Sequence, residues 1–321
     1  RNTTEGINLV ARGFPFSPGD VVLTSDIEHN SNLMPWQRLV KETGVEHRIF
    51  KTNADTTFNL ESFEAALAQG NVWMVAVTAQ SNLSGVSFPV DEIVKKSHKT
   101  GAVVLIDAAQ AVPSNSVDVR KLTVDFLVFS VHKMMGPTGI GVLYGKEESL
   151  NKLAPLVTGG ETIKDTTYTG SVPAELPDRF EAGLQNYAGV IGAAAAVDYL
   201  TERCLADLKK HETQLNAIMT EEVLKIPGVR ILGPVEPERR NGLLNFSIED
   251  LEAHDLARLL DEIDFIMVRA GKQCVHSWFN ATGAPDSLRA SVYAYNTVDE
   301  AALFGRRVRE LAKHLRKDTN R

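Results

Sequence analysis

The sequence predicts an α/β fold in which a mostly parallel sheet lies between helices, with a smaller α+β region at the C-terminal end. Two observations support this prediction. Short β-rich runs alternate with helical stretches up to about residue 150, and this alternation is typical of parallel sheets flanked by helices. After Gly170 the pattern changes to long helices mixed with separate strands. We therefore expect a large domain over residues 1–184 and a smaller α+β domain over residues 185–321.

In the first part of the chain, apolar runs mark the strands and glycines mark helix ends. The run Val103–Ile106 is apolar throughout, which indicates a strand buried on both faces. Gly44 and Gly101 follow helical stretches and are expected to end them. The expected strands are residues 21–24, 72–77, 103–106, 126–129 and 140–144. The expected helices are residues 34–42, 59–69 and 89–99, and residues 3–10 lead from a loop into a helix.

In the second part, Pro173 and Pro177 indicate a loop before the first long helix. The expected helices are residues 187–200, 205–224, 253–261 and 299–315. The expected strands are residues 229–232 and 243–248. Because these strands are mixed with helices without regular alternation, they predict a small α+β unit.

Composition excludes several classes of protein. The chain has 321 residues, with 43% hydrophobic and 23% charged residues, as in an ordinary globular protein. A net charge of −7 gives no reason to expect nucleic acid or an anionic membrane as a partner, and no apolar run approaches the roughly 20 residues that span a bilayer. Two cysteines in so long a chain point to a reducing cytosol. The chain begins at Arg1 without a signal-peptide pattern, and we expect an N-terminal segment to precede it.

Lys133, shortly after the expected strand 126–129, is the first candidate functional residue. Burial disfavours the charge of a lysine, so a lysine at the end of a buried strand suits chemistry that needs a neutral amine. Such an amine forms Schiff bases with carbonyl compounds, including pyridoxal 5′-phosphate (PLP). Taken alone, a lysine in this position more often points to solvent, so the interpretation depends on its neighbours.

Polar residues follow several of the expected strands, at the edge where open α/β sheets bind ligands. Each also has a simpler structural role: Asp107 as a helix cap, Gln110 as a surface turn residue, and His29 as a structural hydrogen-bonding group. Their joint occurrence at successive strand ends favours a ligand site. The strand-end segments are Asp26–Asn30, Gln80–Gly85, Asp107–Gln110 and Ser130–Lys133.

These residues all have a role if the ligand is PLP. A buried Asp107 would keep the pyridine nitrogen protonated, and Gln110 would donate a hydrogen bond to the phenolic oxygen. His29 would stack on the ring and move protons. The candidates for binding the phosphate are Thr3, Thr4, Ser130 and His132. Threonines at a helix start are more often ordinary N-caps, so their part in this site stays open.

Together these segments resemble the signature of the class V aminotransferase family, whose members are fold-type I PLP enzymes. This resemblance rests on the segments Asp107–Gln110 and Ser130–Gly141. More narrowly, nearly the whole chain is similar to the group II (SUF-type) cysteine desulfurases. The narrower resemblance rests on residues 3–10, 28–29, 35–36, 81–82, 179–183, 289–291 and 295–297.

The resemblance implies the fold-type I architecture and a role for each matching residue. Lys133 would bond covalently to PLP, and Asp107 would pair with the pyridinium nitrogen. Asn82 and Arg289 would bind the substrate carboxylate, a task for which the planar fork of arginine is well suited. The residues implied to bind PLP are Thr3, Thr4, His29, Asp107, Gln110, Ser130, His132 and Lys133. The residues implied to be catalytic are Lys133, His29 and Cys274.

Cys274 lies in the segment Arg269–Cys274, where the family has its catalytic cysteine. A glycine-containing loop suits a nucleophile that must reach a substrate sulfur, and the nearby Lys272 and His276 would favour the thiolate. The simpler interpretation is that Cys274 is an inert small hydrophobic residue. We expect no role for Cys204.

The chain departs from the family pattern at two places. Lys272 and Gln273 replace the usual histidine-rich lead-in to the cysteine. Leu184 stands where the family often has a threonine that reaches the phosphate of the partner subunit. The resemblance therefore makes the cofactor chemistry more secure than the substrate preference.

The implied activity converts L-cysteine to L-alanine and holds the sulfur as a persulfide on Cys274. An acceptor protein would take the sulfur for iron–sulfur cluster assembly or other sulfur biosynthesis. The resemblance also implies a homodimer, and we expect no metal site. The alternatives are a selenocysteine lyase, another member of the class V family, or a non-catalytic, truncated PLP-fold scaffold. Cys274 argues against an aminotransferase, which needs no cysteine nucleophile, but it separates the lyase poorly.

Overall fold

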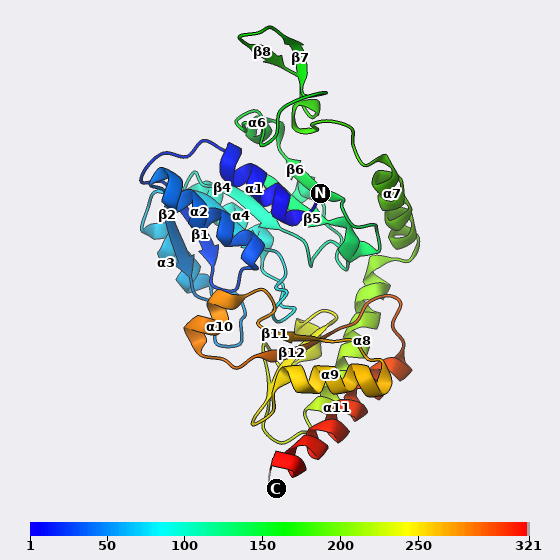
Figure 1. The fold of residues 1–321 in the computed structure, drawn as a ribbon. Coiled ribbons are helices and arrows are strands. Elements are labelled where there is room, and N and C mark those ends of the chain that lie inside the picture. Colours follow the sequence, from blue (N-terminus) through cyan, green and yellow to red (C-terminus); the bar gives the residue numbers. More distant parts are fainter. Residues whose placement is uncertain (320–321) are drawn as a thin grey trace.

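The computed structural model describes residues 1–319 and contains a six-stranded sheet, a four-stranded sheet and a projecting hairpin (Figure 1). The strands of the six-stranded sheet lie in the order β2-β1-β3-β4-β5-β6, and all neighbours are parallel except β5 and β6. Their bounds are β1 (Val21–Ser25), β2 (Glu46–Phe50), β3 (Val72–Thr78), β4 (Val103–Asp107), β5 (Phe126–Ser130) and β6 (Gly141–Gly145). The predicted mostly parallel sheet is confirmed.

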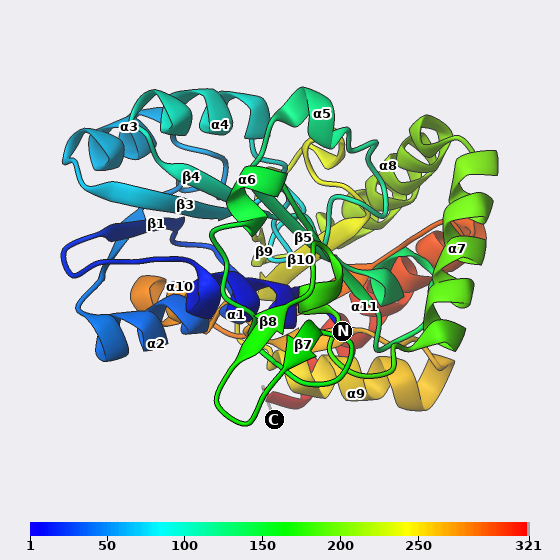
Figure 2. The same cartoon turned by 90° about the horizontal axis from the view of Figure 1, so that it is seen from above.

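Helices cover both faces of this sheet (Figure 2). They are α1 (Thr3–Gly13), α2 (Met34–Thr43), α3 (Leu60–Ala68), α4 (Val90–Lys99) and the short α5 (Val119–Leu122) and α6 (Glu147–Leu150). Because side chains alternate along a strand, Val22 and Met74 pack with α1 and α2, while Leu23 and Val75 pack with α3 and α4. Both faces of the central strands are therefore buried, as their continuous apolar runs predicted.

The edge strand β2 was not predicted from the sequence, because most of its residues are at least partly exposed. Its segment Glu46–Phe50 is polar and mostly accessible, with only Phe50 fully buried. A strand that pairs on one side only needs neither a continuous apolar run nor strict alternation. The helix end predicted at Gly44 is confirmed, because Gly44 has φ 76° and its N–H donates to the Val40 carbonyl.

The second half of the chain forms a four-stranded antiparallel sheet against long helices. The strands lie in the order β11-β12-β10-β9. Their bounds are β9 (Val229–Ile231), β10 (Leu243–Ile248), β11 (Arg269–Gly271) and β12 (Ser287–Ser291). The helices are α7 (Tyr187–Glu202), α8 (Leu205–Val223), α9 (Ala253–Asp264), α10 (His276–Thr282) and α11 (Val298–Thr319). Leu244, Phe246 and Leu288 of the sheet pack with Leu215 and Met219 of α8.

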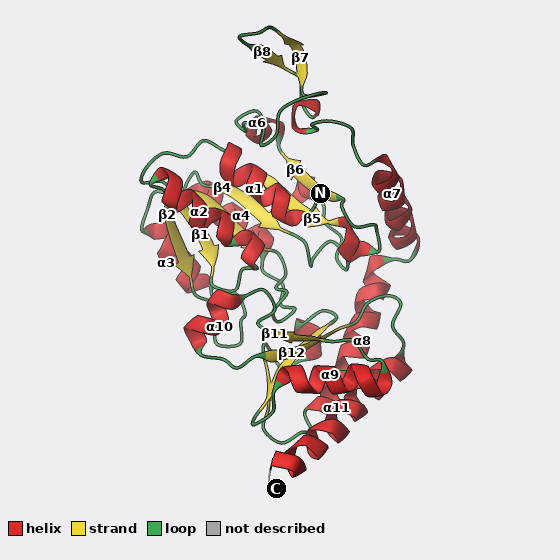
Figure 3. Ribbon diagram, viewed as in Figure 1, coloured by secondary structure: helices red, strands yellow, loops and turns green. Residues whose placement is uncertain are grey.

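The hairpin β7 (Ile163–Thr166) and β8 (Ser171–Pro173) projects away from both sheets (Figures 1 and 3). The loop expected around Pro173 is therefore wrong in part, because Pro173 is the last residue of β8 and a proline is tolerated where no ladder hydrogen bond is needed. Short 3-10 turns complete the chain at η1 (Asn30–Asn32), η2 (Val131–Met134), η3 (Asp178–Phe180) and η4 (Pro237–Arg239). None of the helices within residues 1–319 is long and apolar enough to cross a membrane.

Candidate active site

One pocket lies where the carboxyl ends of β3, β4 and β5 meet residues of β11 and β12. It contains every predicted cofactor and substrate residue. The pocket is lined by Asn2, Thr3, Thr4, His29, Ser31, Thr78, Gln80, Asn82, Asp107, Ala109, Gln110, Ser130, His132, Lys133, Arg269 and Arg289. Because parallel strands end at the same edge of a sheet, residues far apart in the sequence come together here.

Lys133 and Asp107 lie at the ends of neighbouring strands. Asp107 is the last residue of β4 and is only 5% exposed. Its Oδ1 accepts from the Ala109 backbone N–H at 2.9 Å, and burial raises its pKa. Lys133 follows β5 in η2, where burial lowers the pKa of its amine and the nearby Asp107 opposes that shift. The lysine is thus shifted toward the neutral amine that its position predicted.

Asp107 provides a test of whether the site fits PLP. A buried carboxylate normally needs a cation or several hydrogen bonds. Within residues 1–319, the Asp107 carboxylate forms no ion pair. In that range it accepts one hydrogen bond, from the backbone N–H of Ala109. A protonated pyridine nitrogen supplies both a positive charge and an N–H donor, so the donor set fits this group.

The N-terminus of α1 and the end of β5 form the predicted phosphate region. Ser130 Oγ accepts from the Thr3 backbone N–H at 2.8 Å and shares a hydrogen bond with Thr3 Oγ1 at 2.7 Å. Thr4 and the exposed His132 line the same region. Asn2 caps α1 by accepting from the Glu5 N–H. A helix N-terminus beside hydroxyl groups and a histidine is a suitable environment for a phosphate.

Gly141, at the start of β6, allows α1 to begin this close to the sheet. A Cβ on Gly141 would lie 2.5 Å from the Asn2 Cα. Any side chain at this position would therefore displace the start of α1 from β6. The glycine-rich segment after Lys133 thus positions the predicted phosphate region as well as continuing the chain.

His29 is held in one tautomer on the pocket wall. Its Nδ1 accepts from the Ser31 backbone N–H at 3.0 Å, so the proton of the neutral ring lies on Nε2. Burial, followed by the positive charges of Lys133 and Arg269, lowers the pKa of His29 to about 4. The imidazole is therefore neutral near pH 7, which suits stacking on a ring. Gln110 lies in the same pocket, half-buried.

The depressed pKa of His29 predicts how stability changes with pH in the cofactor-free protein. The unfolded chain protonates His29 below about pH 6.5, but the folded chain does so only below about pH 4. Its contribution to stability is therefore lost as the pH falls from about 6.5 to about 4. We expect His29→Phe to lose less thermal stability than the parent between pH 7 and pH 4.5, as measured by calorimetry. Equal losses in the two proteins would contradict the assigned pKa.

Arg289 and Asn82 connect the two sheets. Arg289 Nη1 donates to the Asn82 backbone carbonyl at 2.8 Å. Burial lowers the Arg289 pKa to about 10, so the guanidinium stays charged near pH 7. Its Nε is buried and has no hydrogen-bond partner within residues 1–319. The guanidinium as a whole lines the pocket, and a charged guanidinium there fits a ligand carboxylate. The Asn82 side chain donates to the Gln273 carbonyl at 2.7 Å, so its predicted contact with substrate stays a prediction.

Cys274 is part-buried and lies beside the pocket rather than among its lining residues. Its Sγ is 2.9 Å from Nη2 of Arg269, which does line the pocket. Arg269 of β11 lies directly opposite Arg289 of β12. The nucleophile predicted from the sequence is therefore connected to the pocket through a cation that the prediction missed. Cys204, in contrast, is exposed at the start of α8.

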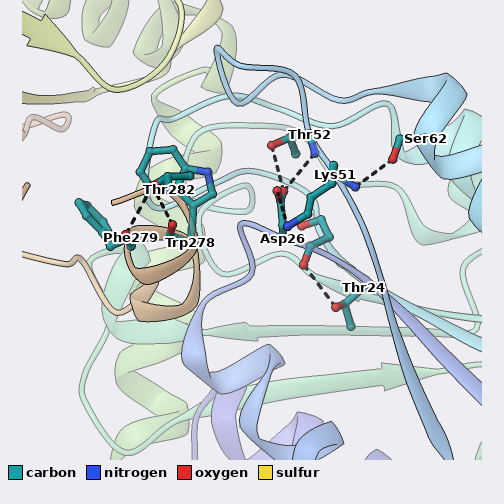
Figure 4. Close-up of polar contacts among 9 residues, drawn as sticks. Thr24, Asp26, Lys51, Thr52, Ser62, Trp278, Phe279 and Thr282 are labelled. Carbon is teal, nitrogen blue, oxygen red and sulfur yellow. Dashed lines mark hydrogen bonds and ion pairs between the residues drawn. The ribbon is translucent and has the colours of Figure 1, made fainter. Parts of the chain in front are cut away.

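The chain that follows Cys274 returns to the core of the six-stranded sheet. Val275 and Phe279 are each 1% exposed in that core, and Trp278 packs beside them. Figure 4 draws Trp278 and Phe279 of α10 together with Asp26, which accepts from the Thr52 backbone N–H and hydroxyl. Cys274 is therefore fixed between β11 of the smaller sheet and the core of the larger one.

Several pocket residues were not predicted from the sequence. Arg269 lies in a segment that was singled out for its cysteine, but its pairing with Arg289 depends on short strands that no pattern revealed. Glu28, next to His29, is not among the lining residues; it is 2% exposed, and burial raises its pKa to about 8. It accepts from the Ser25 hydroxyl and the Asn32 side chain. Besides Arg269, the lining residues without a predicted role are Asn2, Ser31, Thr78, Gln80 and Ala109.

Comparisons with known proteins find relatives over most of the chain. The family model described as aminotransferase class-V matches residues 1–304. A probable cysteine desulfurase from Halalkalibacterium halodurans is 39% identical over 94% of this chain and 73% of its own length. A cysteine desulfurase from Haloferax volcanii is 38% identical, over 94% of this chain and 70% of the relative.

Solved structures with the same fold are known as well. An apo cysteine desulfurase from Thermococcus onnurineus NA1 superposes with a TM-score of 0.93 and 37% identity, covering 98% of this chain and 78% of that one. A cysteine desulfurase from Escherichia coli gives a TM-score of 0.92 and 31% identity, with the same coverage. The predicted fold-type I architecture is therefore confirmed, and the chain belongs to the aminotransferase class-V family.

Proposed function

We propose that the protein is a PLP-dependent cysteine desulfurase, which releases L-alanine from L-cysteine and retains the sulfur. The observation that carries this proposal is the placement of Lys133, Asp107 and Arg289 in one pocket, with the Cys274 thiol beside it. The curated relatives and the solved structures that match most of the chain are also named as cysteine desulfurases.

The residues present fit PLP from one end of the cofactor to the other. Asp107 would pair with the ring nitrogen, His29 would lie against the ring, and Gln110 would contact the phenolic oxygen. The start of α1 would bind the phosphate together with Thr3, Thr4, Ser130 and His132. When bound, PLP supplies an electron sink conjugated to the α-carbon of an amino acid substrate.

Substrate binding and proton transfer are assigned to residues of this chain. Arg289 would hold the substrate carboxylate through its charged guanidinium, which lines the pocket. The Lys133 amine, whose pKa burial lowers, would take and return the proton at the α-carbon. Neutral His29 carries its proton on Nε2, the atom available to exchange a proton on this face of the pocket.

Cys274 would receive the sulfur. Its Sγ, as the thiolate, forms a bond to the substrate sulfur while the bond between that sulfur and the β-carbon breaks. The electron pair of the broken bond stays with the carbon, which takes a proton and leaves as alanine. The product on the protein is a persulfide on Cys274. The adjacent guanidinium of Arg269 would stabilise the anionic sulfur on either side of this step.

Product analysis tests this function. The PLP-loaded protein is incubated with L-cysteine, with L-selenocysteine or with an α-keto acid and an amino donor, and alanine, sulfide and selenide are measured. We expect alanine from L-cysteine at the highest kcat/KM. Alanine from L-selenocysteine alone would identify a selenocysteine lyase, amino transfer to the keto acid would identify an aminotransferase, and no turnover with PLP bound would identify a scaffold.

We further propose that the protein is a homodimer. The β7–β8 hairpin has no core of its own, and Tyr168 at its tip is fully exposed. Leu184, just beyond the hairpin, is 86% exposed, and Ile191 on α7 is 72% exposed. Apolar residues this accessible within one stretch of the chain are typical of a subunit interface. Light scattering after gel filtration should give twice the mass of the chain, and a monomer at micromolar concentration would contradict the proposal.

We also propose a cellular compartment and an acceptor for this reaction. Two free thiols suit a reducing compartment, which we propose to be the cytosol. There a sulfur-acceptor protein would take the persulfide sulfur for iron–sulfur cluster assembly or other sulfur biosynthesis. We also propose the two domains that the sequence predicts. The domain over residues 1–184 holds the cofactor, and the domain over residues 185–321 supplies Cys274 and Arg289.

A further inference from the structure

Cys274 lies in a turn that is unfavourable for its residue type. The Val275 N–H donates to the Lys272 carbonyl at 2.8 Å and closes a four-residue turn. Its two central residues, Gln273 and Cys274, have φ of 50° and 59°. Positive φ at both central positions is the pattern of a type I′ turn, which favours glycine and asparagine. Neither residue of this turn is of that kind, so other contacts must hold it in place.

The Gln273 side chain provides the first of these contacts. It is 1% exposed. Its Nε2 lies 3.1 Å from the Arg269 carbonyl, 3.1 Å from the Gly271 carbonyl and 3.2 Å from the Ser287 carbonyl. Its Oε1 is buried and has no hydrogen-bond partner in the part of the chain that the structure describes. The side chain therefore acts through its two N–H donors, which join the ends of β11 and β12 beneath the turn.

The backbone of the turn is held from the opposite side by the larger sheet. The Gln273 carbonyl accepts from Asn82 Nδ2 at 2.7 Å. The Cys274 carbonyl accepts from the Asn30 backbone N–H at 2.8 Å. Both donors belong to pocket segments, because Asn30 follows His29 and the Asn82 carbonyl holds Arg289. The turn is thus fixed relative to the groups that would hold substrate and cofactor.

We propose that Gln273 is a positioning residue, which fixes the Cys274 sulfur at the edge of the pocket on a rigid turn. This inference rests on the proposed function, because it concerns the nucleophile of that reaction. A displacement of about 1 Å at a reacting group is enough to slow a reaction about 100-fold. A nucleophile held in place before substrate arrives avoids the entropy of ordering a loop at each turnover.

Two substitutions separate the side-chain amide from the turn itself. Gln273→Met keeps the volume and removes both N–H donors. Gln273→Gly removes the same donors but allows the positive φ without strain, so the turn conformation stays accessible. If the amide positions the sulfur, both variants lose function. Gln37→Met makes the same chemical change at an exposed position on α2 and is the matched control.

The first readout is steady-state turnover of L-cysteine by the PLP-loaded proteins. We expect kcat to fall about 10- to 100-fold in Gln273→Met and Gln273→Gly, with KM within about threefold of the parent, because Arg289 is untouched. Gln37→Met should match the parent. Retention of the parent kcat by Gln273→Gly would overturn the proposal, whether or not Gln273→Met folds.

The second readout does not depend on turnover. Cys274 alkylation by iodoacetamide is followed by mass spectrometry at about pH 9.5, where ordinary thiols are ionised and the rate reports access. Exposed Cys204 gives an internal reference in every sample. We expect the ratio of the Cys274 rate to the Cys204 rate to rise severalfold in both Gln273 variants, and an unchanged ratio would overturn the proposal. If the parent makes no alanine, the proposed function fails. The ratio of alkylation rates would still test whether Gln273 holds Cys274 in place.

Discussion

Replacing Lys133 with alanine is expected to abolish turnover of L-cysteine, with a loss of at least about 1,000-fold in kcat. The residue lies in the 3-10 turn after β5, inside the pocket, and burial lowers the pKa of its amine. It is the pocket amine that this account assigns both to covalent attachment of PLP and to proton transfer at the substrate α-carbon. The Lys133→Ala variant should therefore lose both functions together.

The measurement combines activity with covalent trapping of the cofactor. Borohydride reduces the bond between a lysine and PLP and fixes the cofactor to the protein, so the parent should retain PLP on denaturation after this treatment. Lys133→Ala should not retain it. Lys41→Ala, at an exposed position on α2, is the control and should behave as the parent. PLP fixed by borohydride in the Lys133→Ala variant would remove Lys133 from its assigned role.

Unfolding should not explain the effect of this substitution. Lys133 forms no ion pair within residues 1–319, and its burial disfavours the charged amine. Removing the amine relieves that desolvation cost. The cofactor-free Lys133→Ala variant should therefore melt no lower than the cofactor-free parent when the two are compared by calorimetry.

Replacing Cys274 with alanine is expected to have the second largest effect. Sulfur transfer from L-cysteine should fall at least about 100-fold, because Cys274 carries the thiol beside the pocket and none of the lining residues is a cysteine. The cofactor contacts do not involve this side chain, so PLP fixed by borohydride should remain at the parent level. This combination separates the nucleophile from the cofactor machinery.

Cys204→Ala is the matched control, since it removes the other free thiol of the chain from an exposed position. It should retain the parent kcat and KM. Full sulfide release by Cys274→Ala would show that sulfur leaves the substrate without this nucleophile, and it would favour a lyase over a desulfurase.

The elements that the sequence predicted well are those buried on two faces. β3 and β4 were found because their apolar runs meet helices on both sides of the sheet. β2 was missed because it is an edge strand with exposed polar residues. β11 has only three residues, and its pairing with β12 is specified by register rather than by any local pattern.

The same distinction applies to the site. Strand ends in a parallel sheet converge by topology, so the positions of Asp107, Ser130 and Lys133 near one another followed from strand order alone. The contacts of Arg269 and Gln273 could not be predicted in this way. Both depend on a left-handed turn formed by residues that do not favour it, and the distant Asn82 donates a hydrogen bond to the Gln273 carbonyl of that turn. In the sequence, Lys272 and Gln273 depart from the family pattern next to Cys274. That departure indicated that this region is unusual, but it did not reveal the contacts of the turn.

The most direct test of the account is the fate of the sulfur in one turnover. The PLP-loaded protein is mixed with limiting L-cysteine in the absence of any acceptor thiol, and the peptide that contains Cys274 is analysed by mass spectrometry. The account predicts one added sulfur atom on Cys274, equimolar with the alanine released and removed by a reductant. Alanine formation with no sulfur on Cys274, or with the sulfur on Cys204, would contradict it.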